Sequence, residues 1–266
     1  MAGRPARAGR NEPDSADDRS VAAKLFAVID AFSAPSAAAS LSLTAIARRA
    51  NLPMSTAHRM VAEWVNWGGL TRQDDGKYSL GMRLWEVGVQ TPTARNLRTI
   101  ALPYLEDLYE ATREHVQLAI LDDYDALYVE KLSGHRAVNI ISRVGGRLPL
   151  HTTGVGLVLL AYAPPELIDS YLARPLQRFL PGTVTSPERL RRRLAGIRAQ
   201  GIAHMSEEMT VGSSSIAAPI RDRTGNVVAA VSIVTRTTST ADPAQENAVR
   251  SAALGVSRAL GYRRAS

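Results

Sequence analysis

"NLPMSTAHRMVAEW", residues 51–64, decides how the first part of the chain folds. After Pro53, apolar residues recur at spacings of three and four, which is the pattern of an amphipathic helix. These apolar residues are Ala57, Met60, Val61 and Trp64. The opposite face then carries short polar and basic side chains, namely Ser55, Thr56, His58 and Arg59. Such a helix packs on a neighbour through one face and offers hydrogen-bonding groups to a partner through the other.

The preceding stretch, "SLTAIARRA" at residues 42–50, predicts a second short helix with Ser42 or Thr44 as its N-cap. Asn51 tolerates the left-handed conformation that ends such a helix. Two short helices joined by a tight turn match the helix-turn-helix, whose second helix lies in the major groove of DNA. Any helical hairpin with a solvated face gives the same pattern, so the turn alone does not decide between the two.

The next stretch supplies a further element of a DNA-binding domain. "LTRQDDGKYSL", residues 70–80, predicts two strands joined by a tight turn, which would form a wing beside the helices. Hydroxyls near helix starts can reach phosphates, and basic side chains can reach phosphates or guanine edges. The predicted DNA-binding residues are Ser42, Thr44, Ser55, Thr56, His58, Arg59, Arg72 and Lys77.

Composition narrows the class of protein. With 266 residues, of which 45% are hydrophobic, the chain can bury the core of one large domain or two smaller ones. The net charge of +7 suits a polyanionic partner, although an enzyme with arginine-rich helices would have the same charge. The absence of cysteine excludes disulfides, cysteine-ligated zinc, iron–sulfur clusters and thiol nucleophiles, and favours a cytoplasmic protein. The longest apolar run, residues 155–163, is too short to cross a membrane.

The pattern along the chain predicts four segments. Residues 1–19 mix Arg, Pro, Gly and acidic residues and are predicted to be a disordered tail. Residues 20–82 form the winged helix-turn-helix, residues 83–95 a linker helix, and residues 96–264 a second domain. The helical pattern continues from residue 84 to about 113, with Pro92 and Pro103 as predicted interruptions.

The second domain mixes helices and strands without strict alternation. Strands are predicted over residues 115–122, 126–133, 138–144, 213–222 and 227–236. Helices are predicted to begin near Thr152 or Thr153, near Pro164 and Pro187, and over residues 244–262. This order favours an α+β fold with a mostly antiparallel sheet.

"LPLHTTGVG", residues 148–156, has the parts of a small-anion site. A helix start offers free N–H groups, the threonines offer hydroxyls, and the glycines allow close approach of the backbone. A carboxylate would fit there. The alternative is that threonine only caps the helix and glycine only permits tight packing.

Taken together, the stretches resemble the IclR-type transcriptional regulators over residues 20–262. The best-matching pieces are "SLTAIARRANLPMSTAHRMV", "LTRQDDGKYSLGMRLWEVG", "GGRLPLHTTGVGLVLLAY", "EEMTVGSSSIAAPI" and "GNVVAAVSIV". The resemblance implies a winged helix-turn-helix that also dimerises, a linker helix and a GAF-like effector-binding domain. It further implies a homodimer assembled as a dimer of dimers, double-stranded DNA with a pseudo-palindromic operator as partner, and a small organic acid as effector. No cofactor and no metal are implied.

The resemblance also places the effector site. Carried over by position, the effector-binding residues are Leu148, Thr153, Gly154, Val155, Met205, Ser215, Ser232 and Val234. Three of them depart from the family pattern, since Met205 replaces an acid, Ser215 a cysteine and Val234 a small polar residue. A less polar, more adaptable pocket favours a larger, partly apolar or aromatic acid. Leu157 replaces the usual lysine, which either weakens the charge complement for an anion or only alters the helix surface.

The favoured function is therefore a ligand-responsive regulator, more often a repressor, of a catabolic or metabolic operon. One alternative is a GAF-like sensor that acts through protein partners. Another is a serine hydrolase that pairs one of residues 213–215 with His151 or His204, although the chain lacks a G-x-S-x-G elbow. No histidine has the spacing of a helical metal site, so His151 is expected to pack the loop, and Glu207 and Glu208 to be structural.

Overall fold

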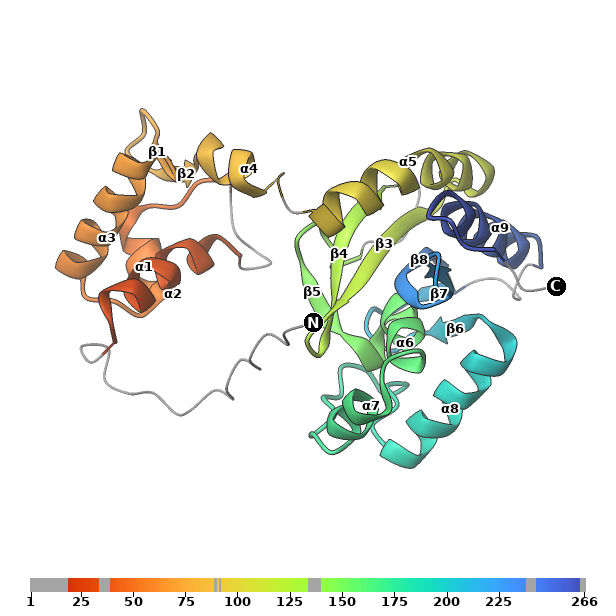
Figure 1. The fold of residues 1–266 in the computed structure, drawn as a ribbon. Coiled ribbons are helices and arrows are strands. Elements are labelled where there is room, and N and C mark those ends of the chain that lie inside the picture. Colours follow the sequence, from red (N-terminus) through yellow and green to blue (C-terminus); the bar gives the residue numbers. More distant parts are fainter. Residues whose placement is uncertain are drawn as a thin grey trace. The chain divides into compact units, whose positions relative to one another are not determined.

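The computed structural model describes residues 19–33, 39–88, 90, 92–133, 140–237 and 243–263. The chain divides into two compact units, residues 1–95 and residues 96–266, whose elements are labelled in Figure 1. Each unit has its own buried hydrophobic core. Within the described ranges, none of the helices has the length and apolar character needed to cross a membrane.

The first unit is built from four helices and a two-stranded hairpin. In chain order they are α1 (Val21–Asp30), α2 (Leu43–Ala50), α3 (Met54–Trp67), β1 (Leu70–Arg72), β2 (Tyr78–Leu80) and α4 (Met82–Gly88), with a 3-10 turn at Ala31–Ser33 after α1. Val28, Ile46 and Met60 bring α1, α2 and α3 together, and each is at most 2% exposed. The Trp64 indole N–H also donates to the Leu25 carbonyl over 2.8 Å, which fixes α3 against α1.

Local signals set the turn between α2 and α3. The Ser42 hydroxyl accepts the N–H of Ala45 over 3.2 Å, so Ser42 rather than Thr44 is the N-cap of α2. Asn51 ends α2 with a φ of 51°, in the left-handed region. The hairpin is held to the chain just before α2, because Leu41 and Tyr78 exchange backbone hydrogen bonds of 2.8 Å. The predicted winged helix-turn-helix is therefore confirmed.

The structure bears on two of the predicted segments. Residues 1–18 of the predicted tail lie outside the described residues, but Arg19 donates to the carbonyl of Ala50 over 3.0 Å and to that of Asn51. In the region of the predicted linker helix, residues 83–95, α4 ends at Gly88 and α5 (Pro92–Thr112) begins at Pro92, which is one of the two predicted interruptions.

The prediction that Pro103 interrupts the helix was wrong, since Pro103 lies inside α5. A proline inside a helix costs about 3 kcal/mol through its missing N–H and its steric clash. That cost is offset here by tertiary packing, because Ala101, Leu105 and Leu108 on the same helix are at most 3% exposed. Burial thus outweighs the local preference.

The second unit wraps helices around one antiparallel sheet (Figure 1). Besides α5, its elements are β3 (His115–Asp122), β4 (Asp125–Leu132), β5 (Arg147–Pro149), a 3-10 turn at Leu150–Thr152, α6 (Gly154–Ala161), α7 (Pro165–Leu172), α8 (Pro187–Gln200), β6 (Ala203–Ser206), β7 (Ser213–Arg221), β8 (Val227–Arg236) and α9 (Pro243–Ala259). The strand order is β5-β4-β3-β8-β7-β6, with antiparallel pairing throughout. The predicted α+β class is confirmed.

One predicted strand is absent. Of residues 138–144, positions 138 and 139 lie outside the described residues, and Ile140–Val144 form no strand. This segment is instead held by side chains, since Lys131 donates to the Ser142 carbonyl over 2.9 Å. Gly145 then turns the chain with a φ of 75° into β5. The segment therefore contacts side chains of β3 and β4 and covers a cavity rather than extending the sheet.

Helix α6 is central to the second core. All eight of its residues are buried, and it packs on β3, β7 and β8. Leu157 is 0% exposed. The lysine-to-leucine change does not alter the helix surface, because Leu157 lies in the hydrophobic core; it also does not line the cavity described below.

Candidate functional sites

The first candidate site is the exposed face of α3. Ser55, His58 and Arg59 are exposed there and Thr56 is half-buried, while the apolar side of the helix is covered by α1 and α2. Pro53 is the N-cap and supplies no side-chain hydrogen bond to the first turn. The N–H groups of that turn therefore remain available to an acceptor outside the helix, such as a phosphate oxygen.

The other predicted DNA-binding residues lie on α2 and the hairpin of the same unit. Ser42, Thr44 and Arg72 are exposed. Lys77 is exposed too, but its ammonium group pairs with Asp75 over 2.7 Å, and the same hydrogen bond lowers the pKa of the Asp75 carboxyl. A phosphate must therefore compete with Asp75 for Lys77, whereas Arg72 has no carboxylate partner among the described residues.

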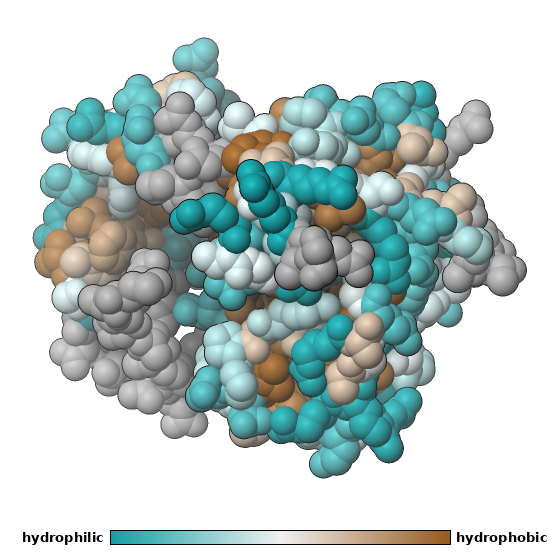
Figure 2. Space-filling view, turned by 45° about the vertical axis from the view of Figure 1, so that its right-hand side comes forward, coloured by the Kyte–Doolittle hydropathy of each residue, from teal (hydrophilic) through white to brown (hydrophobic). Residues whose placement is uncertain are grey.

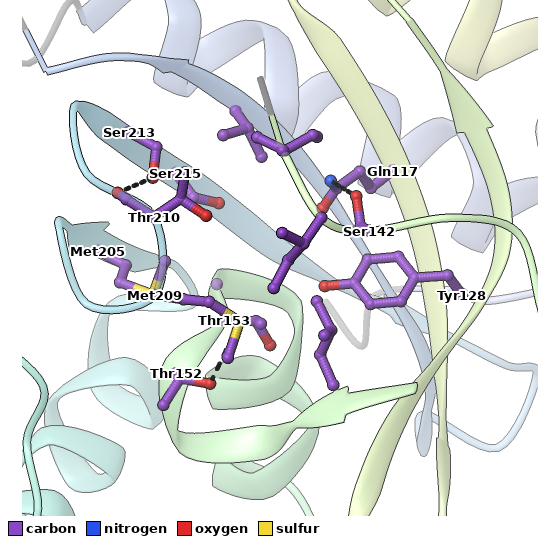
Figure 3. A pocket seen from close by; sticks show the side chains of 15 residues that line it. Gln117, Tyr128, Ser142, Thr152, Thr153, Met205, Met209, Thr210, Ser213 and Ser215 are labelled. Carbon is purple, nitrogen blue, oxygen red and sulfur yellow. Dashed lines mark hydrogen bonds between the residues drawn. The ribbon is translucent and has the colours of Figure 1, made fainter. Parts of the chain in front are cut away.

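The second candidate site is a cavity in the second unit, between the start of α6 and the sheet (Figure 3). Six of the eight predicted effector residues line it: Leu148, Thr153, Gly154, Met205, Ser215 and Val234. Val155 and Ser232 do not line it. The side chain of Val155 is buried in the core, and the Ser232 hydroxyl lies behind the lining, where it donates to the Gln117 side chain over 3.3 Å.

The start of α6 forms one end of the cavity. The Thr153 hydroxyl accepts the N–H of Gly156 over 3.1 Å and so caps the helix. The N–H groups of Gly154 and Val155 have no acceptor within the helix, by the geometry of a helix start. A Cβ at Gly154 would lie 2.5 Å from the Ser215 hydroxyl oxygen, so only glycine allows the backbone to approach β7 this closely. The threonine cap, the tight packing and the accessible N–H groups therefore coexist.

Sequence reasoning missed the polar group at the other end. The Gln117 side-chain amide, which is 4% exposed, donates to the Ser142 hydroxyl over 2.6 Å. Tyr128 lies beside this pair in Figure 3. Burial raises the pKa of the Tyr128 phenol, and the Thr153 hydroxyl opposes this only in part. The phenol therefore remains a neutral hydrogen-bond donor. Gln117 could have been noticed as the one amide in the apolar run "HVQLAIL".

Four further lining residues missed from the sequence come from residues 140–144 and from the loop before β7. They are Ile140, Ile141, Met209 and Thr210. No local pattern marks these residues, because long-range packing alone brings their segments to α6.

The three departures from the family pattern form one wall of the cavity. Met205 on β6 is opposite Ser215 on β7, and Ser215 is opposite Val234 on β8. All three are at most 9% exposed. The three positions at which the resemblance implies an acid, a cysteine and a small polar residue thus form one row across β6, β7 and β8, in which Met205 and Val234 are apolar and Ser215 is polar.

The cavity is small, and the described residues that line it carry no formal charge. Among those residues none is acidic or basic, so an anion held by them would be bound by N–H groups and hydroxyls. Its volume, measured for the centres of water-sized molecules, is about 40 Å³, and one water needs about 10–15 Å³ on that measure. A larger ligand therefore requires side chains to move. Met205 and Met209 are suited to this because methionine side chains are flexible.

The histidines proposed for a hydrolase are otherwise engaged. Both ring nitrogens of His151 have partners, the Tyr171 hydroxyl at 2.7 Å and the Gln177 carbonyl at 3.0 Å. Burial lowers the pKa of His151, which keeps the ring neutral. His204 pairs with Glu246 over 3.0 Å. The expectation that His151 holds the loop in place agrees with these contacts.

The two glutamates also have structural partners. Glu208 pairs with Arg193 over 2.6 Å, and Glu207 accepts the N–H of Gly212 over 2.9 Å. No group of three or more His, Cys, Asp or Glu residues suited to a metal ion occurs in the described part of the chain.

Comparison with known proteins identifies the family of both units. Residues 21–74 match the IclR helix-turn-helix domain, and residues 89–258 match the bacterial transcriptional regulator IclR C-terminal domain. The chain is 34% identical over 230 residues to the HTH-type transcriptional regulator XynR of Escherichia coli, which covers 85% of this chain and 91% of that protein. It is 32% identical over 198 residues to the Transcriptional repressor IclR of the same organism, covering 73% of this chain and 72% of that one.

A solved structure is similar over almost its whole length. It is an IclR homolog from Microbacterium hydrocarbonoxydans, complexed with 4-hydroxybenzoate. The TM-score is 0.85 and the identity 42%, with 91% of this chain and 99% of that chain covered. Both family models, the fold and the similar regulators agree: this chain belongs to the IclR family of bacterial transcriptional regulators.

Proposed function

We propose that the chain is a cytoplasmic repressor of a catabolic or metabolic operon. It binds a pseudo-palindromic operator as a homodimer within a dimer of dimers. Its α3 helix enters the major groove, where Arg59 and His58 reach base edges or phosphates while Ser55, Thr56 and the first-turn N–H groups hold phosphates. Ser42, Thr44, Arg72 and Lys77 add backbone contacts, which position the helix without reading sequence. Binding of an effector in the second unit weakens this complex.

The proposed effector is a monocarboxylic acid with an aromatic body and a second polar group. The observation that carries this proposal is the uncharged cavity with two separate polar ends and an apolar wall between them. A single carboxylate suits the N–H groups of Gly154 and Val155, since a more highly charged acid would meet no cation among the described residues of the lining. The wall of Met205 and Val234 suits a ring. Gln117 suits a ring hydroxyl, and the similar protein complexed with 4-hydroxybenzoate supports this ligand class.

Calorimetric titration with 4-hydroxybenzoate, benzoate, pyruvate and glyoxylate tests the ligand class. We expect 4-hydroxybenzoate to bind most tightly and to release operator DNA in the same concentration range. Tighter binding of glyoxylate or pyruvate than of either aromatic acid would overturn the proposal.

Substituting Gln117 tests how the ligand lies in the cavity. Gln117→Met keeps the length of the side chain but removes its hydrogen-bonding groups. It should weaken 4-hydroxybenzoate binding about fivefold, since one net hydrogen bond is worth about 1 kcal/mol. Benzoate, which lacks the hydroxyl, is the matched control and should change much less. Equal losses for the two acids would show that Gln117 does not contact the hydroxyl.

A further inference from the structure

A second cavity lies on the other side of the segment that forms the effector cavity. In the β4–β5 pair, Ala126 is opposite Leu148, and Asp125 is opposite Pro149. Successive residues of a strand point to opposite faces. Leu148 therefore lines the effector cavity, whereas Pro149 and Asp125 line a separate groove closed by α7 and the chain that follows it. We call this the rear groove.

The rear groove is already open. Its volume is about 400 Å³, measured in the same way as the effector cavity. Its walls are largely apolar, since the rings of Tyr124 and Tyr171 stack with centroids 6.2 Å apart, and Pro149 and Leu176 lie beside them. A small ligand can therefore enter without rearrangement of the core.

The hydroxyl groups on these walls are occupied. The Tyr124 hydroxyl donates to Ser170 over 3.1 Å, and the Tyr171 hydroxyl is 2.7 Å from a ring nitrogen of His151. Burial raises the pKa of the Tyr171 phenol to about 12, so it remains neutral. The tyrosines thus offer ring surface rather than charge or free hydroxyls.

Two opposite charges face the groove without pairing to each other. The Asp125 carboxylate is half-buried and makes no hydrogen bond or ion pair with the described residues; burial raises its pKa, and the charges of Arg147 and Arg174 oppose this effect. Its neighbour Arg147 is paired with Asp122. The Arg174 guanidinium lies 4.2 Å from the centre of the Tyr124 ring and has no carboxylate partner within that same part of the chain. Stacking on Tyr124 orients Arg174, and its N–H groups remain free for an anion.

We propose that the rear groove binds a zwitterionic ligand, an α-amino acid with an apolar side chain. The ammonium group donates to Asp125, the carboxylate accepts from Arg174, and the apolar side chain lies against Tyr124, Tyr171 and Leu176. Both charged hydrogen bonds form only with a ligand that carries both charges. This site is separate from the proposed effector cavity, with which it shares the segment of residues 148–152.

Calorimetric titration of the full chain with L-phenylalanine and L-leucine tests the site. We expect saturable binding of both, and no comparable binding of 3-phenylpropionate or phenethylamine, each of which lacks one charge. Asp125→Asn and Arg174→Gln should each weaken amino-acid binding at least tenfold, because charged hydrogen bonds are the stronger ones. Arg191→Gln, on the exposed side of α8, is the control and should leave binding unchanged.

Further titrations separate this proposal from the proposed effector site. All three variants should bind 4-hydroxybenzoate as the wild-type chain does, and Gln117→Met should bind L-phenylalanine normally. Absence of saturable binding for both amino acids would overturn the rear-groove proposal, as would wild-type affinity in both Asp125→Asn and Arg174→Gln. Neither result would bear on the proposal that the effector binds in the cavity at the start of α6.

Discussion

Gly156→Ala places one methyl group where the turn before α6 leaves no room. The added Cβ would lie 2.5 Å from the Leu150 carbonyl oxygen, 2.5 Å from the Thr153 hydroxyl oxygen and 2.6 Å from the Leu150 Cα. Two of these atoms belong to the backbone, so the clash cannot be relieved by rotating a side chain. Overpacking of this kind costs about 1–3 kcal/mol, and loss of the Thr153 cap adds about 1 kcal/mol. The better helix propensity of alanine returns about 1 kcal/mol.

We therefore expect Gly156→Ala to lower the free energy of unfolding by about 1–3 kcal/mol. Gly196→Ala in α8 is the matched control, because a Cβ there meets no atom within 4 Å. It should stabilise the chain by about 0.5–1 kcal/mol. For a domain of this size, 1 kcal/mol shifts the Tm by about 2–4 °C.

Scanning calorimetry and far-UV circular dichroism suit this comparison, since the tryptophans, Trp64, Trp67 and Trp85, all lie in the first unit and do not report on α6. The two substitutions should shift the transition of the second unit in opposite directions. A Gly156→Ala variant as stable as the wild-type chain would refute the steric reasoning.

The remaining predictions concern charge. Arg193→Ala leaves Glu208, whose side chain is 6% exposed, without its partner and should lower the free energy of unfolding in urea by about 3–5 kcal/mol. Arg191→Ala removes the exposed pair with Asp169 and should lower it by at most about 1 kcal/mol. Equal effects of the two substitutions would contradict the distinction between buried and exposed ion pairs. Burial lowers the pKa of His151 below its unfolded value of about 6.5, although the charge of Glu208 acts to raise it. As the pH falls, the unfolded state therefore binds the proton first. The stabilisation that comes from a neutral His151 is fully present above about pH 6.5 and is lost as the pH falls from there through the lower pKa of the folded state. The unfolding free energy should thus fall more steeply from pH 7 to 5 in the wild-type chain than in His151→Asn, and parallel curves would show that His151 does not contribute.

The elements that were predicted correctly are specified by neighbouring residues. Ser42 and Asn51 limit α2 through a cap and a left-handed residue, and both signals act within a few positions of the helix they end. The strand over residues 115–122 was predicted with the bounds that β3 has, because its side chains alternate and an Asp-Asp turn follows.

The errors arose where distant contacts outweigh local preference. Pro103 stays within a helix because the packing of α5 compensates for it. Residues 140–144 have the composition of a strand but form none, and Lys131 on β4 holds them through a hydrogen bond to the Ser142 carbonyl. Gln117 becomes part of the cavity only because Ser142, 25 positions away, and Ser232, 115 positions away, meet its side chain. Such pairings are set by the tertiary fold and have no signature at short range.

Fluorescence anisotropy with labelled DNA from upstream of the protein's own gene tests the central claim most directly. We expect tight binding that resists random competitor DNA, with a salt dependence reflecting about 6–10 phosphate contacts. Arg59→Ala should weaken this binding while leaving the circular dichroism spectrum unchanged, and 4-hydroxybenzoate should release the DNA. The claim would be contradicted if the wild-type chain showed no preference over competitor at any salt concentration, with and without 4-hydroxybenzoate.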